Sequence, residues 1–166
     1  AIQQRLDNNA YINQYTNDEP KKNNELVCKF QTIDSIAELN IIINEINNIG
    51  FVAIDIETNS LEIEKAELVG ISLCYNESKA FYIPINHQDI KTNKKIKNQL
   101  TENEVLEKIR EICFNPAILK IGQNIKYDIR VLKKYDIEFQ SFDDTMLMSY
   151  SLDNGLTRHG MDDLAY

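Results

Sequence analysis

The chain has 166 residues, of which 43% are hydrophobic and 27% charged, and its formal net charge at pH 7 is −8. This length and balance suit one globular domain with its own core, and no apolar run approaches the roughly 20 residues of a membrane span. The negative charge argues against a broad basic face that grips duplex nucleic acid, but not against a short single strand held by metal ions and a few side chains.

The N-terminal part divides into a polar segment and a first pair of elements. Residues 1–24 are rich in Asn and charge, lack an apolar period, and are predicted to be a linker or disordered tail. They carry no apolar signal-peptide segment, so we expect a soluble, cytoplasmic protein. Residues 26–30 are typical of a strand, and Asp34 or Ser35 could cap a helix that ends at Gly50.

Residues 51–58 form an apolar strand pattern that carries two carboxylates near its end. Strand side chains repeat every second residue, so Asp55 and Glu57 leave the same face roughly 6 to 7 Å apart. Two carboxylates this close repel each other, and a divalent cation would remove the conflict. The pattern therefore indicates metal ligands at the rim of a sheet, with a solvated strand end bearing two surface acids as the alternative.

Two further strands are expected at 68–75 and 80–85, joined by a hairpin turn at 76–79. Three strands would then lie side by side, mostly antiparallel. The polar, lysine-rich residues 88–99 are expected to form an exposed loop.

The remaining chain alternates between helices and short strands. Thr101 and Glu104 form a capping-box pattern that opens a helix, and Pro116 ends it. The later elements are expected to be a strand at 117–121, a helix at 125–135, a strand at 139–142, a helix at 144–152 capped by Asp144, and a helix start near Gly160. This order predicts an α/β fold with an RNase H-like mixed β-sheet of about five to six strands flanked by helices.

A second group of polar residues follows the strand at 117–121. Asn124 is a favourable N-cap, and Asp128 falls in the first helical turn, where the helix dipole favours an anion. Asp128 interrupts an otherwise apolar face and so needs a partner. That partner is either a group bound at a functional site or merely Lys126, Arg130 or the helix terminus. Amide and phenol groups that could bind a phosphate or sugar lie on the same segment: Gln123, Asn124 and Tyr127. Tyr127 could equally be a packing residue.

The cysteines and histidines do not indicate a disulfide set, a metal site or a catalytic relay. Cys28, Cys74 and Cys113 lie far apart beside apolar neighbours and are predicted to be reduced core thiols. His87 and His159 are too few for a histidine metal cluster or a Ser-His-Asp relay.

Taken together and in order, several segments resemble the 3′-5′ exonuclease domain of bacterial DNA polymerase I, over residues 26–166. They are residues 55–61, 68–72, 82–85 with His87, 122–128, 142–147 with Tyr150, and 158–159 with Met161 and Leu164. On this resemblance residues 25–166 form the exonuclease domain.

The resemblance implies a DEDD-type proofreading exonuclease with two divalent metal ions, Mg²⁺ or Mn²⁺, with Zn²⁺ possible at the first site. Asp55 would bridge the ions, Glu57 would bind the first, and Asp128 would help hold the second. The implied partners are the single-stranded 3′ end of DNA and a polymerase domain in the same parent chain. No membrane and no obligate protein partner is expected.

The resemblance also implies contacts to the terminal nucleotides. The residues concerned are Thr58, Leu61, Gln123, Asn124, Tyr127 and Arg158. Leu61 would wedge at the last bases, although it could instead be plain core. Arg158 would contact phosphate, although it could instead cap a helix or pair with Asp153 or Asp162.

Such domains complete the site with a third motif, Tyr-x-x-x-Asp, which residues 144–166 do not supply. The domain is therefore expected to be incomplete at its C-terminal end, as in a piece of a longer polymerase, with weak or no turnover of its own. The rival interpretations are an RNase D-like 3′-5′ exoribonuclease with the same acids and a non-catalytic structural module of the polymerase.

Overall fold

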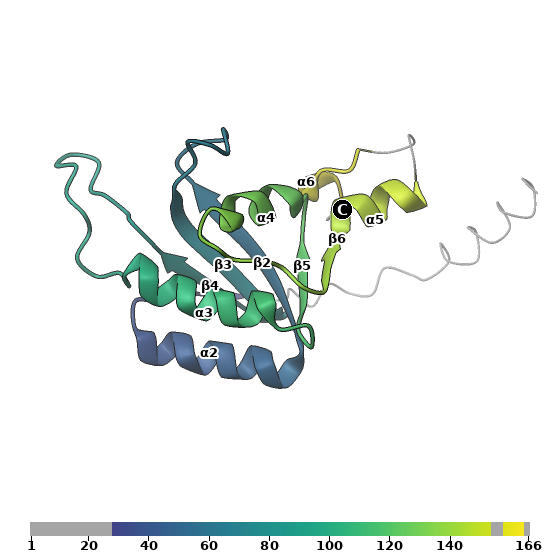
Figure 1. Ribbon diagram of the computed structural model, residues 1–166, viewed down its shortest axis with the longest axis horizontal. Coiled ribbons are helices and arrows are strands. Elements are labelled where there is room, and N and C mark those ends of the chain that lie inside the picture. The colour runs from purple at the N-terminus through teal and green to yellow at the C-terminus, as the bar shows by residue number, and fades with distance from the viewer. Residues whose placement is uncertain (1–27, 154–157, 165–166) are drawn as a thin grey trace, which may run out of the picture.

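The computed structural model describes residues 28–153 and 158–164, and these build a single six-stranded sheet with helices against it (Figure 1). The expected tail at 1–24 lies outside the described residues. The strands are β1 (Lys29–Thr32), β2 (Phe51–Thr58), β3 (Leu68–Asn76), β4 (Lys79–Pro84), β5 (Leu119–Gly122) and β6 (Phe142–Asp144). The helices are α2 (Ile36–Ile49), α3 (Glu102–Phe114), α4 (Lys126–Lys133), α5 (Thr145–Leu152) and α6 (Met161–Leu164).

The sheet has the strand order β1-β4-β3-β2-β5-β6, in which β3 is antiparallel to β2 and β4 and the other pairs are parallel. Helices α2, α3 and α4 each connect two parallel strands and always move in the same direction across the sheet. Right-handed crossovers of this kind place all three helices on one face. Figure 1 shows them grouped together against the strands. The predicted mixed sheet and its antiparallel meander are confirmed.

The core lies between that helical layer and the sheet. Strand β2 alternates strictly, with Val52, Ile54 and Ile56 buried and the residues between them exposed. Helix α2 buries Leu39, Ile42, Ile43 and Ile46 on one stripe. Asp55 and Glu57 therefore leave the sheet on the face opposite the core. None of the helices within the described residues combines the length and apolarity needed to cross a bilayer.

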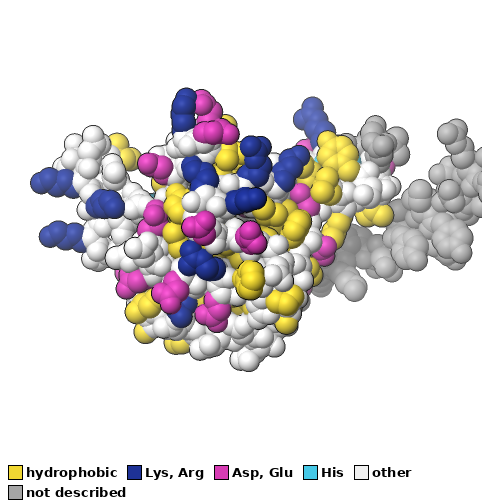
Figure 2. Space-filling model, in the orientation of Figure 1, with side chains coloured by type: hydrophobic (Ala, Val, Ile, Leu, Met, Phe, Trp, Pro, Cys, Tyr) yellow, Lys and Arg dark blue, Asp and Glu magenta, His cyan; other side chains and the backbone are white. Residues whose placement is uncertain are grey.

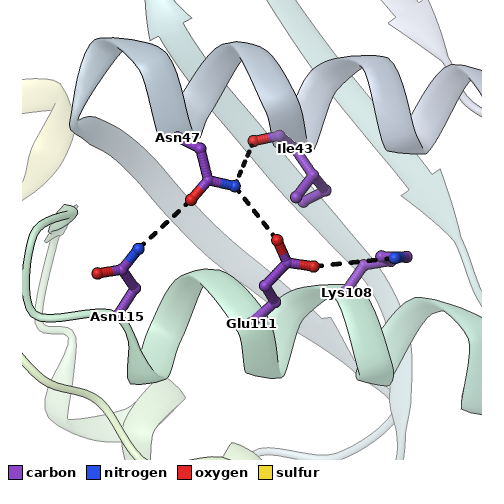
Figure 3. Close-up of polar contacts among 5 residues, drawn as sticks. All are labelled: Ile43, Asn47, Lys108, Glu111 and Asn115. Carbon is purple, nitrogen blue, oxygen red and sulfur yellow. Dashed lines mark hydrogen bonds and ion pairs between the residues drawn. The ribbon is translucent and has the colours of Figure 1, made fainter.

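Polar side chains hold α2 against α3 at the surface (Figure 3). The Asn47 amide donates to the Ile43 carbonyl at 2.9 Å and to a Glu111 carboxylate oxygen at 3.3 Å. Its own oxygen accepts from the Asn115 amide at 3.4 Å, and Lys108 lies 3.8 Å from the second Glu111 oxygen. One asparagine thereby joins both helices near the end of α3.

Several predicted helix ends are confirmed and one is wrong. The Thr101 and Glu104 capping box is formed, Gly50 ends α2 with φ of 85°, and Asp144 caps α5 by accepting from the Met146 amide at 2.9 Å. Asn124 does not cap α4, because Ile125 occupies the N-cap position and Asn124 itself has φ of 55°. Asparagine tolerates this left-handed conformation, which turns the chain between β5 and α4.

The short strands begin later than the sequence predicted. Strand β1 runs to Thr32 rather than ending at residue 30, and β5 begins at Leu119 because a turn at Asn115 precedes it, with the Ile118 amide donating to the Asn115 carbonyl at 3.2 Å. Strand β6 begins at Phe142 after the Gln140 amide has bonded the Cys113 carbonyl at 2.9 Å. Of the predicted core thiols, Cys113 is buried, whereas Cys28 and Cys74 are partly exposed; all three are free.

Strand β5 carries a lysine into the core. Lys120 is fully buried, and its ammonium donates to the carbonyls of Asn115 at 2.9 Å and Ile118 at 2.6 Å. These carbonyls lie just past the end of α3, where a cation also complements the helix dipole. Burial lowers the pKa of Lys120, while the neighbouring Cys113 raises it.

Replacing Lys120 by Ala should destabilise the fold by about 2 to 4 kcal/mol, because the change leaves a cavity and removes the Lys120 donor from the Ile118 carbonyl and one of the two donors from the Asn115 carbonyl. Urea unfolding of Lys120→Ala against the parent chain measures this difference. Lys97→Ala, which alters an exposed loop lysine, is the matched control and should change the free energy of unfolding by less than about 0.5 kcal/mol. Equal stabilities of the two variants would contradict the role given to Lys120.

Candidate active site

The predicted acids gather at the carboxyl ends of β2 and β5, where open α/β sheets place their sites. Asp55 and Glu57 are exposed near the end of β2. Asp128 lies in the first turn of α4 and is only 5% exposed. Two segments that lie far apart in the sequence therefore meet at one rim of the sheet.

The contact that joins them is a hydrogen bond from the Ile56 amide to Asp128 Oδ1, at 3.1 Å. Strand β2 pairs with β5 only from Phe51 to Ala53, because β5 ends at Gly122 and the chain turns into α4. The Ile56 amide thus faces away from β3 with no strand beside it. It donates to the Asp128 carboxylate instead of to a strand carbonyl. The amide belongs to the residue between the two β2 acids, so Asp128 lies against the Asp-x-Glu segment itself.

The alternative that Asp128 serves only an ion pair finds no support in the described part of the chain. There, Lys65 pairs with Glu62 at 2.7 Å and Lys108 with Glu111 at 3.8 Å, and neither pair involves Asp128. Lys126 and Arg130 both stay exposed.

The site raises the pKa of two of its acids. Burial raises the pKa of Asp128 to about 6, and the charges of Asp55 and Asp144 add to this, while the hydrogen bond from Ile56 opposes it. Desolvation, and next the charge of Glu57, raises the pKa of Asp55. Each of these carboxylates is thus destabilised by its surroundings, which a cation would reverse.

The carboxylates do not form a finished ligand cage. Within residues 28–153 and 158–164, no group of three or more His, Cys, Asp or Glu side chains is arranged to hold a metal ion. Asp55 and Glu57 point from the face opposite the core, whereas Asp128 reaches the strand from the side of α4. The donors are nevertheless all carboxylate oxygens, which is the chemistry that Mg²⁺ and Mn²⁺ prefer. By its chemistry the donor set therefore fits such ions.

Tyr127 and Thr58 lock the end of β2 to α4. The Tyr127 hydroxyl lies 2.8 Å from Thr58 Oγ1 and donates to the Ser60 carbonyl at 2.8 Å. Thr58 Oγ1 lies 2.9 Å from the same carbonyl oxygen, so the two hydroxyl protons serve three short contacts. Two of the predicted nucleotide-contacting residues thus touch each other, and the carbonyl of Ser60, which sequence reasoning missed, completes the contact.

Leu61 lies in the loop beyond this contact and is 91% exposed. The alternative that Leu61 is plain core is therefore wrong. A side chain this apolar and this exposed is available to a partner.

Gln123 and Asn124 connect β5 to the C-terminal segment. The Gln123 amide donates to the His159 carbonyl at 2.8 Å, and its oxygen contacts the Thr145 hydroxyl. The Asn124 backbone amide donates to Asp144 Oδ1 at 3.0 Å. The Gln123 bond tethers the segment that carries exposed Arg158 and buried His159 to the turn after β5.

His159, which the resemblance includes in the segment 158–159, is buried in the structure. Its imidazole stacks on Tyr150 with ring centroids 3.7 Å apart, and Nδ1 lies 2.7 Å from Ser149 Oγ. His159 anchors the segment that presents Arg158.

A shallow groove of about 330 Å³ runs beside Asp55 on the face opposite the core. It is lined by β2, β3 and β5 residues together with Gln123 and Met161. The groove therefore links the first acid of the site to the segment tethered by Gln123.

Comparison with known families decides the assignment. The family model described as 3′-5′ exonuclease matches residues 30–166. The chain belongs to this 3′-5′ exonuclease family. It is thus a nuclease domain, and the predicted family resemblance is confirmed.

Curated relatives of the chain are much longer proteins. DNA polymerase I of Rhizobium leguminosarum is 38% identical over 149 residues, which cover 82% of this chain and 15% of that protein. DNA polymerase I of Pseudomonas aeruginosa is 38% identical over 117 residues, covering 69% of this chain and 12% of that protein. The chain therefore spans about one seventh of the length of these relatives.

Solved structures share the fold at low sequence identity. Brucella melitensis NrnC with bound Mg²⁺ aligns with a TM-score of 0.57 at 19% identity, covering 84% of this chain and 60% of that one. Trypanosoma brucei RNase D aligns with a TM-score of 0.56 at 11% identity, covering 75% and 41%. Both show that the mixed sheet and its helices form a nuclease fold.

The raised pKa of Asp128 predicts a specific pH dependence of stability. The folded state holds the Asp128 proton up to a pH of about 6, whereas the unfolded chain releases it near 3.8, so ionisation of Asp128 costs stability as pH rises through this window. Above this pH range, ionised Asp128 lowers the free energy of unfolding by about 3 kcal/mol at most. The Asp128→Asn side chain carries no charge and can still accept from the Ile56 amide. This variant should therefore be more stable than the parent at pH 7.5 and equally stable at pH 4.

Urea unfolding in EDTA at both pH values measures this difference. Glu107→Gln, an exposed acid on α3, is the control and should show the same small difference at both pH values. A stabilisation by Asp128→Asn that is the same at both pH values would contradict a protonation effect.

Proposed function

We propose that this domain removes nucleotides from the single-stranded 3′ end of DNA, as the proofreading 3′-5′ exonuclease of a DNA polymerase I. The observation that carries the proposal is the bond between Asp128 and the Ile56 amide, at 3.1 Å, which brings the α4 acid to the two acids of β2. The family membership and the polymerase names of the relatives support the same activity.

Asp55, Glu57 and Asp128 would hold two divalent ions, Mg²⁺ or Mn²⁺, with Zn²⁺ possible at the first position. Such ions supply an activated water and stabilise charge on both oxygens of the displaced phosphodiester. The fit rests on an all-oxygen donor set and on two carboxyl groups whose raised pKa values a cation would lower. The three side chains orient the ions, and no protein nucleophile is required.

The surrounding residues would bind the terminal nucleotides. Thr58 and Tyr127 hold the end of β2 rigid through their 2.8 Å contact, so that exposed Leu61 can lie against the last bases. Arg158 would meet phosphate, in keeping with its exposure and its tether to β5. Gln123 and Asn124 would contact sugar or phosphate from the turn after β5, with Gln123 exchanging one of its internal bonds to do so.

The larger assembly is part of the proposal. The relatives extend far beyond the matched region, which supports a polymerase domain in the same parent chain as the source of the 3′ end. The third motif lies outside residues 144–166, so the 166-residue chain itself should turn over slowly.

RNase D-like action on RNA is the second candidate, because the fold of Trypanosoma brucei RNase D matches this one. At 11% identity that likeness concerns the fold alone, whereas the relatives at 38% identity are DNA polymerases. A site that selected RNA would have to contact the terminal 2′-hydroxyl.

Replacing the two β2 acids together should abolish cleavage. With 5′-labelled single-stranded DNA and Mn²⁺, the chain should produce a ladder that shortens from the 3′ end, and Asp55→Asn/Glu57→Gln should lower the rate by about 10³-fold or more, since the acids hold ions worth several kcal/mol. Calorimetric titration of Mn²⁺ should show the matching loss of metal binding by the double variant, whether or not turnover is slow.

Glu62→Gln/Glu64→Gln is the matched control, because it removes two acids from the neighbouring loop and should leave metal binding unchanged. A matched RNA oligonucleotide and one DNA with a single 3′-terminal ribonucleotide separate the two candidate substrates. Undiminished Mn²⁺ binding by Asp55→Asn/Glu57→Gln would refute the proposed metal site, and faster cleavage of RNA than DNA would replace the proposed substrate.

A further inference from the structure

Strand β4, which lies on the far side of β3 from β2, carries a contact that the proposed mechanism does not use. Tyr82 extends from β4 and its hydroxyl lies 2.8 Å from His87 Nε2, with the two rings edge to face at a centroid distance of 5.8 Å. The backbone of His87 is held in turn, because its amide donates to Gln99 Oε1 at 2.9 Å and its carbonyl accepts from Gln99 Nε2 at 3.1 Å. The phenol is therefore fixed at both ends, by β4 and by a clamped imidazole.

The Tyr82 ring crosses over β3 at Gly70. A Cβ placed on Gly70 would meet the Tyr82 hydroxyl oxygen at 2.1 Å and its Cζ at 2.4 Å, so a side chain at this position would occupy the space of the phenol. The direction of that Cβ is informative, because Gly70 is the direct antiparallel partner of Glu57. Side chains of directly opposite residues leave the same face, with their Cβ atoms about 5 Å apart. The phenol thus occupies the position next to the Glu57 side chain.

The strand geometry at this point is also irregular. Glu57 pairs with Gly70 but Thr58 pairs with Leu68, so β3 carries one extra residue, Val69, at the step after Glu57. Bulges of this kind bend a strand and re-aim side chains, and they occur often beside active sites. Glu57 therefore leaves the sheet where the ladder is interrupted, facing the phenol. Consistent with this proximity, burial and then the charge of Glu57 raise the pKa of Tyr82.

We propose that Tyr82 is a positioning residue for Glu57. His87 donates from Nε2 to the Tyr82 oxygen, which leaves the phenol proton free to donate to the Glu57 carboxylate oxygen that does not bind the cation. The phenol thereby fixes the rotamer of Glu57 and aims its other oxygen at the metal, in the way that hydrogen bonds outside the ligand sphere orient metal-binding carboxylates. This inference rests on the proposed function, because Glu57 is a metal ligand only there.

Tyr82→Phe tests the inference, because it keeps the ring over Gly70 and removes only the hydroxyl. Its affinity for Mn²⁺, measured by calorimetric titration and by electron paramagnetic resonance of free Mn²⁺, should fall roughly 10-fold. His87→Ala should weaken binding in the same direction. Gly70→Ala gives a second approach, since the added methyl group forces the intact hydroxyl to move, and it should weaken Mn²⁺ binding as well.

Tyr75→Phe is the matched control. Its hydroxyl donates to Glu45 Oε2 at 2.5 Å, and its buried ring lies on the core side of the same strand β3. This variant loses the same atom but should bind Mn²⁺ as the parent does. Far-ultraviolet circular dichroism and urea unfolding identify any variant whose fold has changed.

Cleavage kinetics supply a readout that a purely structural role would not produce. Tyr82→Phe should need roughly 10-fold more Mn²⁺ for half-maximal rate, yet approach the parent kcat at saturating Mn²⁺, because Tyr82 does not touch the substrate. Unchanged Mn²⁺ affinity in a folded Tyr82→Phe would overturn the positioning role alone. Absence of Mn²⁺ binding by the parent chain would instead overturn the proposed metal site.

Discussion

The geometry of the site depends on the early end of one strand. Strand β5 stops at Gly122 and pairs with β2 only as far as Ala53, so the amide of Ile56 is left without a backbone partner. A buried amide in this position needs an acceptor, and Asp128 supplies it at 3.1 Å. The same bond therefore gives the Ile56 amide its acceptor and brings a third carboxylate to the acids of β2. A longer β5 would satisfy the amide itself and exclude Asp128 from the site.

This arrangement disfavours the ionised forms of Asp55 and Asp128, two of the three candidate metal ligands. Asp128 accepts one favourable hydrogen bond, yet burial and two nearby carboxylates still raise its pKa to about 6. The fold thus tolerates an ionised acid that its surroundings disfavour, held in place by packing of the neighbouring Val131 and Leu132 in the core. A divalent cation would attract each of these acids and so offset the repulsion between them. The acids that repel each other in the metal-free site would then favour binding of the ion.

Local patterns in the sequence were enough to predict the acids and most elements. The alternation in β2 fixed the face of Asp55 and Glu57, and the capping box and Asp144 fixed two helix starts. These features depend on neighbouring residues. Asn124 was misassigned because its side chain suits a cap equally well as a left-handed turn, and only the path from β5 into α4 decides between them.

Contacts that depend on strand register could not be predicted in the same way. Asp128 on the Ile56 amide and Tyr82 over Gly70 each join residues whose distance in space follows from which strands pair and where a strand ends. The sequence contained a partial signal at Gly70, since a glycine within an apolar strand often marks a bulge or a close approach. What it lacked was the identity of the group that approaches, which is set by the pairing of β3 with both of its neighbours.

The two sides of the acid pair are thus supported by different kinds of structure. On the β5 side, α4 contributes Asp128 and Tyr127, and the 2.8 Å contact between Tyr127 and Thr58 fixes the end of β2. On the β3 side, a bulge, a glycine and a clamped phenol surround Glu57. Because β2 is exposed on the face opposite the core, neither support comes from burial of the acids themselves. The hydrogen bonds hold the groups that flank these acids, and both β2 side chains stay exposed to solvent.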